Sequence, residues 1–192
     1  MTNRVAALMD FDGVFRFYGS RNQRRKHADL PGHLRRATVL SENGRWYEWN
    51  WSAELVKKTN DLRAEYDFNW HWLTSWTGET SLLERTLGLT AGDSDMSWDA
   101  FPDEVKVWGR RATNEEYNAY RAERKLEKVL EFVAANPDTP FMWADDEAAP
   151  LWTEELSHSV SVPHLVLAPD SNLALSLTHL DSMRKFLESV NG

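Results

Sequence analysis

Hydrophobic and polar positions along the chain follow two alternating patterns. Short apolar runs bounded by polar residues predict strands buried in a sheet, at residues 4–9, 68–76, 140–144 and 164–170. Longer stretches with apolar residues at helical spacing predict helices, at residues 52–66, 78–89, 114–135, 149–158 and from Thr178 onward. Because strands alternate with helices, we expect an α/β fold, a three-layer Rossmann-like sandwich with a mostly parallel central sheet and helices on both faces.

Capping and turn residues locate several ends of these elements. Ser52 occupies the N-cap position of the first helix, and Gly88 closes the second. The dipeptide Asn136-Pro137 ends the long helix that precedes it. The final helix is expected to begin at Thr178, whose hydroxyl forms a capping-box-like start with Asp181.

A β-hairpin is predicted between the first strand and the first helix. The sequence ATVLSENGRWYEWNW places β-forming residues on both sides of Glu42-Asn43-Gly44, where Asn-Gly is a strong tight-turn signal. Together with the preceding loop, this hairpin forms a small cap insertion at about 15–51 in a single domain that covers residues 1–192. Residues 89–112 predict mostly loop, with one short strand at Val105–Trp108.

The composition excludes several classes of protein. Cysteine is absent, which excludes a disulfide framework, a thiol nucleophile and a thiolate metal site. The apolar run at the N-terminus is too short for a signal peptide, and nothing approaches the length of a membrane span. We therefore expect a cytoplasmic protein without a membrane partner. The net charge of −8 argues against a broadly basic nucleic-acid surface.

A local basic segment nevertheless follows the first strand. Residues 16–36 contain seven Arg or Lys residues and one acid, Asp29. Two interpretations stay open: a solvated loop, or a patch that contacts phosphate. In the second, the substrate-binding residues are expected to be Arg21, Arg24, Arg25 and Lys26. The chain also has ten tryptophans, most of which we expect in the core, with any exposed ones able to stack on bases.

Three predicted strands end in pairs of polar residues: Asp10 and Asp12, Thr74 and Ser75, and Asp145 and Asp146. The carboxyl ends of parallel strands lie along one edge of a sheet, so these side chains are expected to converge. Carboxylates held close together repel one another unless a cation or a shared proton is present. Mg²⁺ is a hard ion that takes oxygen ligands and substrate phosphate, and its presence would make this arrangement favourable.

The motifs ALMDFDGV, WLTSW, a lysine in RKLEKVLEF, and FMWADDE occur in this order between about residue 5 and residue 147. In that order they resemble the haloacid dehalogenase superfamily of phosphotransferases. The segments LTSW and LAPDSNLALSLTHL, with a Trp just before the acidic pair, are more similar to one branch, the domain found in Swiss Army Knife RNA repair proteins.

The resemblance implies a role for each acid. Asp10 would be the nucleophile that forms an aspartyl-phosphate, and Asp12 would protonate the leaving oxygen and then activate water. Asp145 would hold Mg²⁺ with Asp10 and the backbone carbonyl of Asp12, while Asp146 would ligate through water or orient the metal's surroundings. Thr74 would donate a hydrogen bond to the transferring phosphoryl group.

Three assignments have alternatives. A lysine would neutralise the nucleophile and the phosphoryl oxygens, and Lys125 is favoured over Lys128 because apolar residues follow it at helical spacing. The alternative is that both lysines are solvated and an arginine takes this role. Ser75 replaces Thr74 if the strand ends one residue later. His71 is expected to be a hydrogen-bonded core histidine, because no metal-like His spacing surrounds it.

The resemblance predicts a Mg²⁺-dependent phosphohydrolase that acts through an aspartyl-phosphate. Because the insertion is too small for a large cap domain, bulky substrates are admitted, and the basic segment suggests the terminal phosphate of a nucleotide or nucleic acid. A small-metabolite phosphatase is the alternative within the same chemistry. A non-catalytic binding module of the same fold is the alternative from another class of function.

Overall fold

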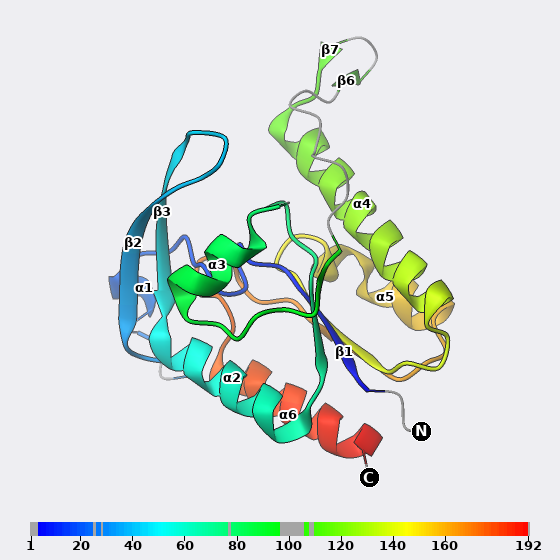
Figure 1. Ribbon diagram of the computed structural model, residues 1–192. Coiled ribbons are helices and arrows are strands. Elements are labelled where there is room, and N and C mark those ends of the chain that lie inside the picture. Colours follow the sequence, from blue (N-terminus) through cyan, green and yellow to red (C-terminus); the bar gives the residue numbers. More distant parts are fainter. Residues whose placement is uncertain are drawn as a thin grey trace.

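A five-stranded, fully parallel sheet runs through the centre of the molecule (Figure 1). The computed structural model describes residues 4–24, 26–27, 29–76, 78–96, 106–107 and 110–191. In spatial order the strands are β5 (Ser94–Asp95), β4 (Asn69–Trp72), β1 (Ala6–Met9), β8 (Phe141–Ala144) and β9 (His164–Leu167). The α/β architecture predicted from the alternating pattern is confirmed.

Alternate residues of β1 face two separate hydrophobic cores. Ala7 and Met9 belong to the core shared with helices α2 (Ala53–Tyr66), α3 (Thr80–Leu87) and α6 (Leu177–Asn191). Ala6 and Leu8 belong to the core shared with α4 (Asn114–Ala135) and α5 (Ala149–Ser159). The central strand is therefore buried on both faces, which explains its continuous apolar sequence. Figure 1 shows the resulting three layers, with α2 and α6 on one face of the sheet and α4 and α5 on the other.

The register of the sheet aligns the strand ends that carry the polar pairs. Met9 lies opposite Trp72 of β4 on one side and opposite Ala144 of β8 on the other. The backbone N–H of Asp10 donates to the carbonyl of Ala144 at 3.0 Å, which extends the pairing of β1 and β8 by one residue. Asp10 therefore leaves the sheet directly beside the residue that precedes Asp145.

The insertion after β1 consists of a one-turn helix and a hairpin. Helix α1 (Arg21–Arg24) is followed by the antiparallel strands β2 (Leu34–Leu40) and β3 (Trp46–Ser52). Gly44 has a positive φ of 76° in the connecting turn, as the Asn-Gly signal predicts. The hairpin packs Val39, Trp49 and Trp51 into the core that contains α2, so it is anchored to the body of the domain.

A second, shorter antiparallel pair precedes α4, made of β6 (Lys106–Val107) and β7 (Arg110–Arg111). The predicted strand at Val105–Trp108 overlaps β6, while Val105 and Trp108 themselves lie outside the described residues. Within the described ranges, no helix combines the length and the apolar run that a membrane-spanning segment requires.

Several predicted boundaries are confirmed, and others are wrong, among them the ends of the strands predicted at 68–76 and 164–170, which end at Trp72 and Leu167, and the start of the final helix. Ser52 accepts a hydrogen bond from the N–H of Leu55 at 3.1 Å as the N-cap of α2, and Gly88 ends α3 in the left-handed conformation. The predicted strand at 68–76 contains β4 but ends at Trp72, because the chain turns after Leu73.

The start of α6 also differs from the prediction. The helix begins at Leu177, one residue earlier than expected. The reciprocal hydrogen bonds of its first turn join Ser176 and His179, with the N–H of His179 donating to Ser176 Oγ and the N–H of Ser176 donating to His179 Nδ1. Asp181 instead pairs with Lys185 on the surface. A histidine at the third helical position can accept the N–H of the N-cap residue as a glutamate does. The prediction considered only an acidic residue at this position.

Candidate functional site

Three carboxylates meet where β1 and β8 end. Asp10, Asp145 and Asp146 each offer an oxygen, and these three oxygens all lie within 4.8 Å of one another. Asp10 and Asp145 are buried, and Asp146 is partly exposed. Of the four expected metal-binding acids, the structure brings the side chains of these three together. We call Asp10, Asp145 and Asp146 the acidic cluster.

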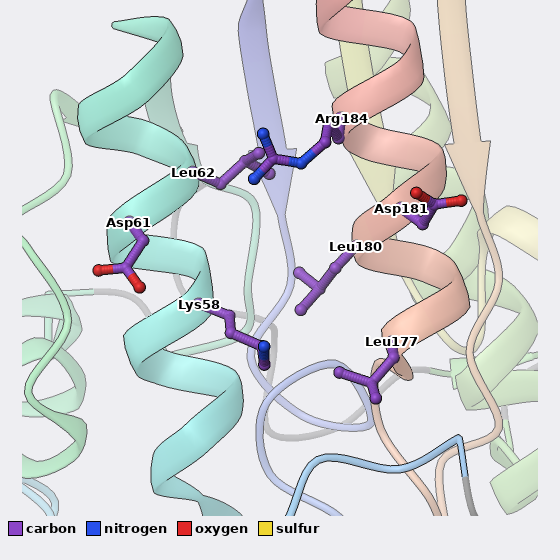
Figure 2. A pocket seen from close by; sticks show the side chains of 7 residues that line it. All are labelled: Lys58, Asp61, Leu62, Leu177, Leu180, Asp181 and Arg184. Carbon is purple, nitrogen blue, oxygen red and sulfur yellow. The ribbon is translucent and has the colours of Figure 1, made fainter.

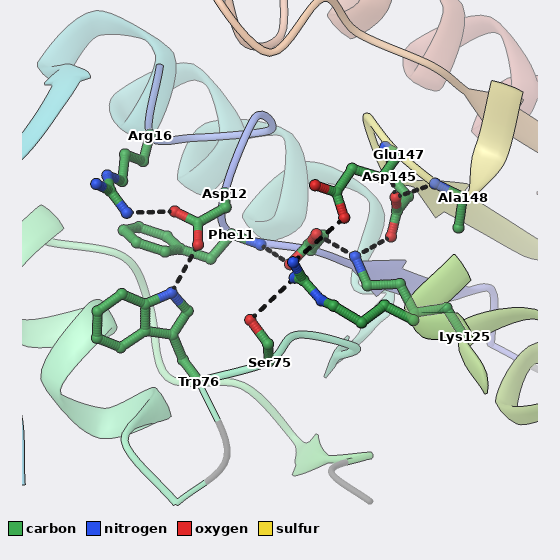
Figure 3. Close-up of polar contacts among 11 residues, drawn as sticks. Phe11, Asp12, Arg16, Ser75, Trp76, Lys125, Asp145, Glu147 and Ala148 are labelled. Carbon is green, nitrogen blue, oxygen red and sulfur yellow. Dashed lines mark hydrogen bonds and ion pairs between the residues drawn. The ribbon is translucent and has the colours of Figure 1, made fainter. Parts of the chain in front are cut away.

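Lys125 bridges two members of the acidic cluster from helix α4. Its fully buried ammonium pairs with Asp10 and lies 2.6 Å from Asp145 Oδ2 (Figure 3). Burial by itself lowers the pKa of Lys125, but the charges of Asp10 and Asp145 and the hydrogen bonds to both raise it above its ordinary value. The alternative lysine, Lys128, pairs with Glu131 at the surface. The structure therefore places Lys125, and not Lys128, against the acidic cluster.

One lysine leaves the acidic cluster with excess negative charge. Burial and then the charge of Asp10 raise the pKa of Asp145, although Lys125 opposes this shift. Burial, followed by the charges of Asp10 and Asp145, raises the pKa of Asp146 to about 8. The single charge of Lys125 therefore does not compensate the three carboxylates of the acidic cluster, whose ligand atoms are all oxygens. These residues fit a hard divalent cation.

Backbone geometry holds the acids in place. Asp10 Oδ1 accepts the N–H of Phe11 at 2.7 Å, and Asp145 Oδ1 accepts the N–H groups of Glu147 and Ala148 at 2.9 and 2.6 Å. Gly13 has a φ of 69°, and a Cβ at this position would lie 2.0 Å from the carboxylate carbon of Asp146. The glycine of the Asp-x-Asp-Gly segment is thus required both by the backbone conformation and by the approach of Asp146.

The side chain of Asp12 lies outside the acidic cluster. Its Oδ1 accepts a hydrogen bond from Arg16 Nη1 at 2.8 Å, and its Oδ2 accepts one from Trp76 Nε1 at 2.9 Å (Figure 3). The expected metal contact of Asp12 was through its backbone carbonyl, so the observed side-chain partners leave that contact open. Phe11 turns into the core, with no exposed surface. The two aspartates on either side of it therefore have different surroundings.

Thr74 and Ser75 follow β4 at the same edge of the sheet. Thr74 is fully buried, and its hydroxyl has no hydrogen-bond partner among the described residues. Ser75 Oγ instead accepts a hydrogen bond from Arg121 Nη2 at 3.3 Å. A buried hydroxyl without a partner is costly, and Thr74 thus has an unused donor next to the strand end.

Arg121 is a site residue that the sequence analysis missed. It lies one helical turn before Lys125 on α4, so both side chains share a face of the helix. Its Nη1 also lies 3.5 Å from Glu147 Oε2. Burial lowers the pKa of Arg121, but the charges of Glu147, Asp10 and Asp12 raise it by more, so the net shift is upward. The four-residue spacing from Lys125 was the signal that could have identified this second cation.

The basic segment does not form one exposed patch. Arg24 is buried, its guanidinium lies 4.4 Å above the centre of the Phe17 ring, and its Nη2 donates to the carbonyl of Pro31 at 3.5 Å. Burial lowers the pKa of Arg24 to about 10. Both interpretations of this segment placed Arg24 at the surface, which is wrong because the side chain packs on Phe17. Lys26 is exposed. Arg21 begins α1, and Arg25 lies outside the described residues.

His71 has a partner outside the acidic cluster. Its Nδ1 lies 2.7 Å from Ser94 Oγ, and burial lowers its pKa. The expected hydrogen bond is present, although the side chain is only partly buried. Most described tryptophans are buried, as expected, and Trp46, beside the turn of the hairpin, is the clear exception with 66% of its surface exposed.

Protein-family models, curated proteins and solved structures were compared with the chain. None of them matched.

A groove between α2 and α6 is separate from this chemistry (Figure 2). It has a volume of about 370 Å³. Apolar and charged side chains line it: Lys58, Asp61, Leu62, Leu177, Leu180, Asp181 and Arg184. None of these residues belongs to the acidic cluster or contacts Asp12.

Replacing Asp146 with Asn tests whether the acidic cluster holds a cation. Without divalent metal, the variant should melt about 2–4 °C above the wild type for each kcal/mol of repulsion removed. Saturating Mg²⁺ should raise the Tm of the wild type by about 5 °C or more and leave that of Asp146→Asn nearly unchanged. Thermal unfolding in EDTA and in Mg²⁺ measures both effects. The exposed Asp138→Asn variant is the control and should behave as wild type; equal Mg²⁺ shifts in all three proteins would contradict a site at the cluster.

Replacing Arg24 with Met tests the interior role of Arg24. Since Nε and Nη1 have no hydrogen-bond partner among the described residues, exchange for an apolar side chain of similar length should increase the free energy of unfolding by about 1 kcal/mol. Urea unfolding measures the change, with exposed Lys26→Met as the matched control. A clear loss of stability in Arg24→Met would show that the packing on Phe17 and the bond to the Pro31 carbonyl stabilise the fold by more than the unpaired N–H groups cost.

Proposed function

We propose that this protein is a Mg²⁺-dependent phosphohydrolase in which Asp10 is the nucleophile. The observation that carries the proposal is the fully buried Lys125, held between Asp10 and Asp145 inside a cluster that has a third carboxylate. A lysine in that position keeps Asp10 ionised and oriented, as a nucleophilic carboxylate requires. Purely structural ion pairs do not need the third acid, which raises the electrostatic cost of the cluster.

The first step transfers the phosphoryl group to the protein. An oxygen of Asp10 bonds to phosphorus while the ester bond between phosphorus and oxygen breaks, and the ester oxygen leaves with the bonding electron pair. Asp12 gives that oxygen its proton. The products of this step are the alcohol and an aspartyl-phosphate on Asp10.

The second step regenerates the protein. Asp12, now a carboxylate, takes a proton from a water molecule whose oxygen bonds to phosphorus. Asp10 leaves with the electron pair of its bond to phosphorus, which releases inorganic phosphate. When bound, Mg²⁺ supplies positive charge to the phosphoryl oxygens and to Asp10, and the residues that would hold it are Asp10, Asp145, Asp146 and the backbone carbonyl of Asp12.

Three side chains are suited to bind the phosphoryl group. The hydroxyl of Thr74 is an unused donor at the end of β4, and Lys125 and Arg121 bring positive charge from α4. Donors that are already in place before the reaction stabilise the charge that develops during phosphoryl transfer. The order of the motifs ALMDFDGV, WLTSW, RKLEKVLEF and FMWADDE along the chain supports assignment to the haloacid dehalogenase superfamily, and we include this assignment in the proposal. The proposal also includes a cytoplasmic location.

The terminal phosphate of a nucleotide or nucleic acid is the substrate class that we propose. Within the described residues, the insertion after β1 consists of one helical turn and a hairpin, which are too small to form a large cap over the strand ends. Trp46 is exposed beside the turn of that hairpin and offers a ring on which a base can stack. Lys26 adds an exposed positive charge to the same insertion.

Replacing Asp10 with Asn tests whether Asp10 is the nucleophile. Asp10→Asn keeps the size of the side chain but removes the nucleophile, so hydrolysis of an aryl phosphate in Mg²⁺ should fall by about a thousandfold or more. The exposed Asp138→Asn variant should retain wild-type kcat. Steady-state release of the phenolate measures both. Wild-type activity in Asp10→Asn would exclude the aspartyl-phosphate mechanism.

A substrate comparison tests the proposed class. With Mg²⁺, kcat/KM should be higher for oligonucleotides carrying a terminal phosphate than for phosphorylated sugars, and Trp46→Ala should lower only the former, by about tenfold. Release of inorganic phosphate from both sets measures this. Preference for the sugars, unchanged in Trp46→Ala, would favour the small-metabolite alternative, and no release from any substrate would favour the binding module.

A further inference from the structure

Trp76 connects the Asp12 carboxylate to the β2–β3 hairpin. The Trp76 indole N–H donates to Asp12 Oδ2 at 2.9 Å, and Arg16 donates to the other oxygen. The hydroxyl of Tyr18 also interacts with Asp12. The two oxygens have four lone-pair directions in all, so these three donors leave one direction for a transferred proton. The two N–H groups therefore orient Asp12 without occupying all of its proton-accepting capacity.

Aromatic neighbours also hold the Trp76 ring. It is only 8% exposed and makes edge contacts with Tyr47 and Trp49 of β3, with ring centres 4.8 and 5.1 Å apart. Phe11, which separates Asp10 from Asp12, contacts both Trp49 and Trp76, at 4.9 and 5.9 Å. We call Phe11, Tyr47, Trp49 and Trp76 the aromatic cluster. Such pairs favour defined ring geometries, so the hairpin restricts the orientation of the Trp76 indole.

We propose that Trp76 is a positioning residue for Asp12, and that the hairpin acts on proton transfer through it. This inference rests on the proposed function, because it assigns Trp76 to the step in which Asp12 gives its proton to the departing ester oxygen. The indole N–H holds the carboxyl group in the orientation from which that proton is delivered. Tyr47 and Trp49 hold the indole.

The chain offers a matched control for this idea. Trp49 belongs to the same aromatic cluster and is fully buried, but its Nε1 has no hydrogen-bond partner among the described residues. Trp49→Phe and Trp76→Phe both shrink an indole to a phenyl ring, and only the second removes a donor to Asp12. A loss that comes from packing alone should affect both variants in the same way.

Two phosphate esters separate proton delivery from the rest of the reaction. Phenylethyl phosphate releases an alkoxide that needs a proton, whereas dinitrophenyl phosphate releases a stable phenolate that does not. The ratio kcat/KM reports events up to the departure of the leaving group, so it excludes the later hydrolysis of the aspartyl-phosphate. Trp76→Phe should lower kcat/KM for phenylethyl phosphate by about tenfold or more and change that for dinitrophenyl phosphate by less than about threefold.

Two further variants complete the test. Trp49→Phe keeps an aromatic ring beside Trp76 and removes no donor to Asp12, so it should change kcat/KM for both esters by the same factor. Tyr47→Leu removes a ring contact of Trp76 from a partly buried position and leaves the N–H in place. It should lower kcat/KM for phenylethyl phosphate selectively, by a smaller factor than Trp76→Phe does. This variant keeps the inference testable if Trp76→Phe does not fold.

The outcomes separate the inference from the proposed function. If wild type hydrolyses both esters and Trp76→Phe slows both equally, or if Trp49→Phe shows the same selective loss, Trp76 does not position Asp12. If Trp76→Phe does not fold, an equal effect of Tyr47→Leu on both esters overturns the inference in the same way. If wild type hydrolyses neither ester in Mg²⁺, the proposed function fails and the inference fails with it.

Discussion

The buried contact of Lys125 with Asp10 and Asp145 is the interaction on which the rest of this structure depends. It joins helix α4 to the ends of two neighbouring strands, and each of the three side chains would be a costly isolated charge without the others. Breaking it leaves uncompensated charge in the interior. Among the residues that the structure describes, no ion pair joins Asp146 to a cation, which makes the edge of the sheet suited to a divalent cation.

The two halves of the site are held by different parts of the chain. Asp10 is held from the α4 side of the sheet by Lys125, and Arg121 lies on the same helix face one turn earlier. Asp12 is held from the hairpin side by Trp76 and Arg16. A nucleophile and a proton-transfer group need opposite properties, because one must stay ionised while the other exchanges a proton. In the proposed reaction, the separate supports of Asp10 and Asp12 meet that requirement.

Much of this arrangement could be predicted from the sequence because it follows from local rules. Parallel strands end at one edge, so Asp10 and Asp145 had to be near each other, and helical spacing favoured Lys125 over Lys128. What could not be predicted depends on side-chain contacts that no local sequence pattern encodes. Trp76 reaches Asp12 across 64 positions, and Arg24 is buried because Phe17 offers a ring for its guanidinium. Charge alone suggested that Arg24 would be solvated, and the packing of the loop decided otherwise.

Trapping the covalent intermediate tests the central claim most directly. The protein is mixed with a phosphate ester and Mg²⁺, quenched in acid, digested and analysed by mass spectrometry. The account predicts a phosphorylated peptide that contains Asp10, with a modification that hydroxylamine removes, as expected for an acyl phosphate. Hydrolysis of the ester without any such adduct, or with the phosphate on a different residue, would contradict it.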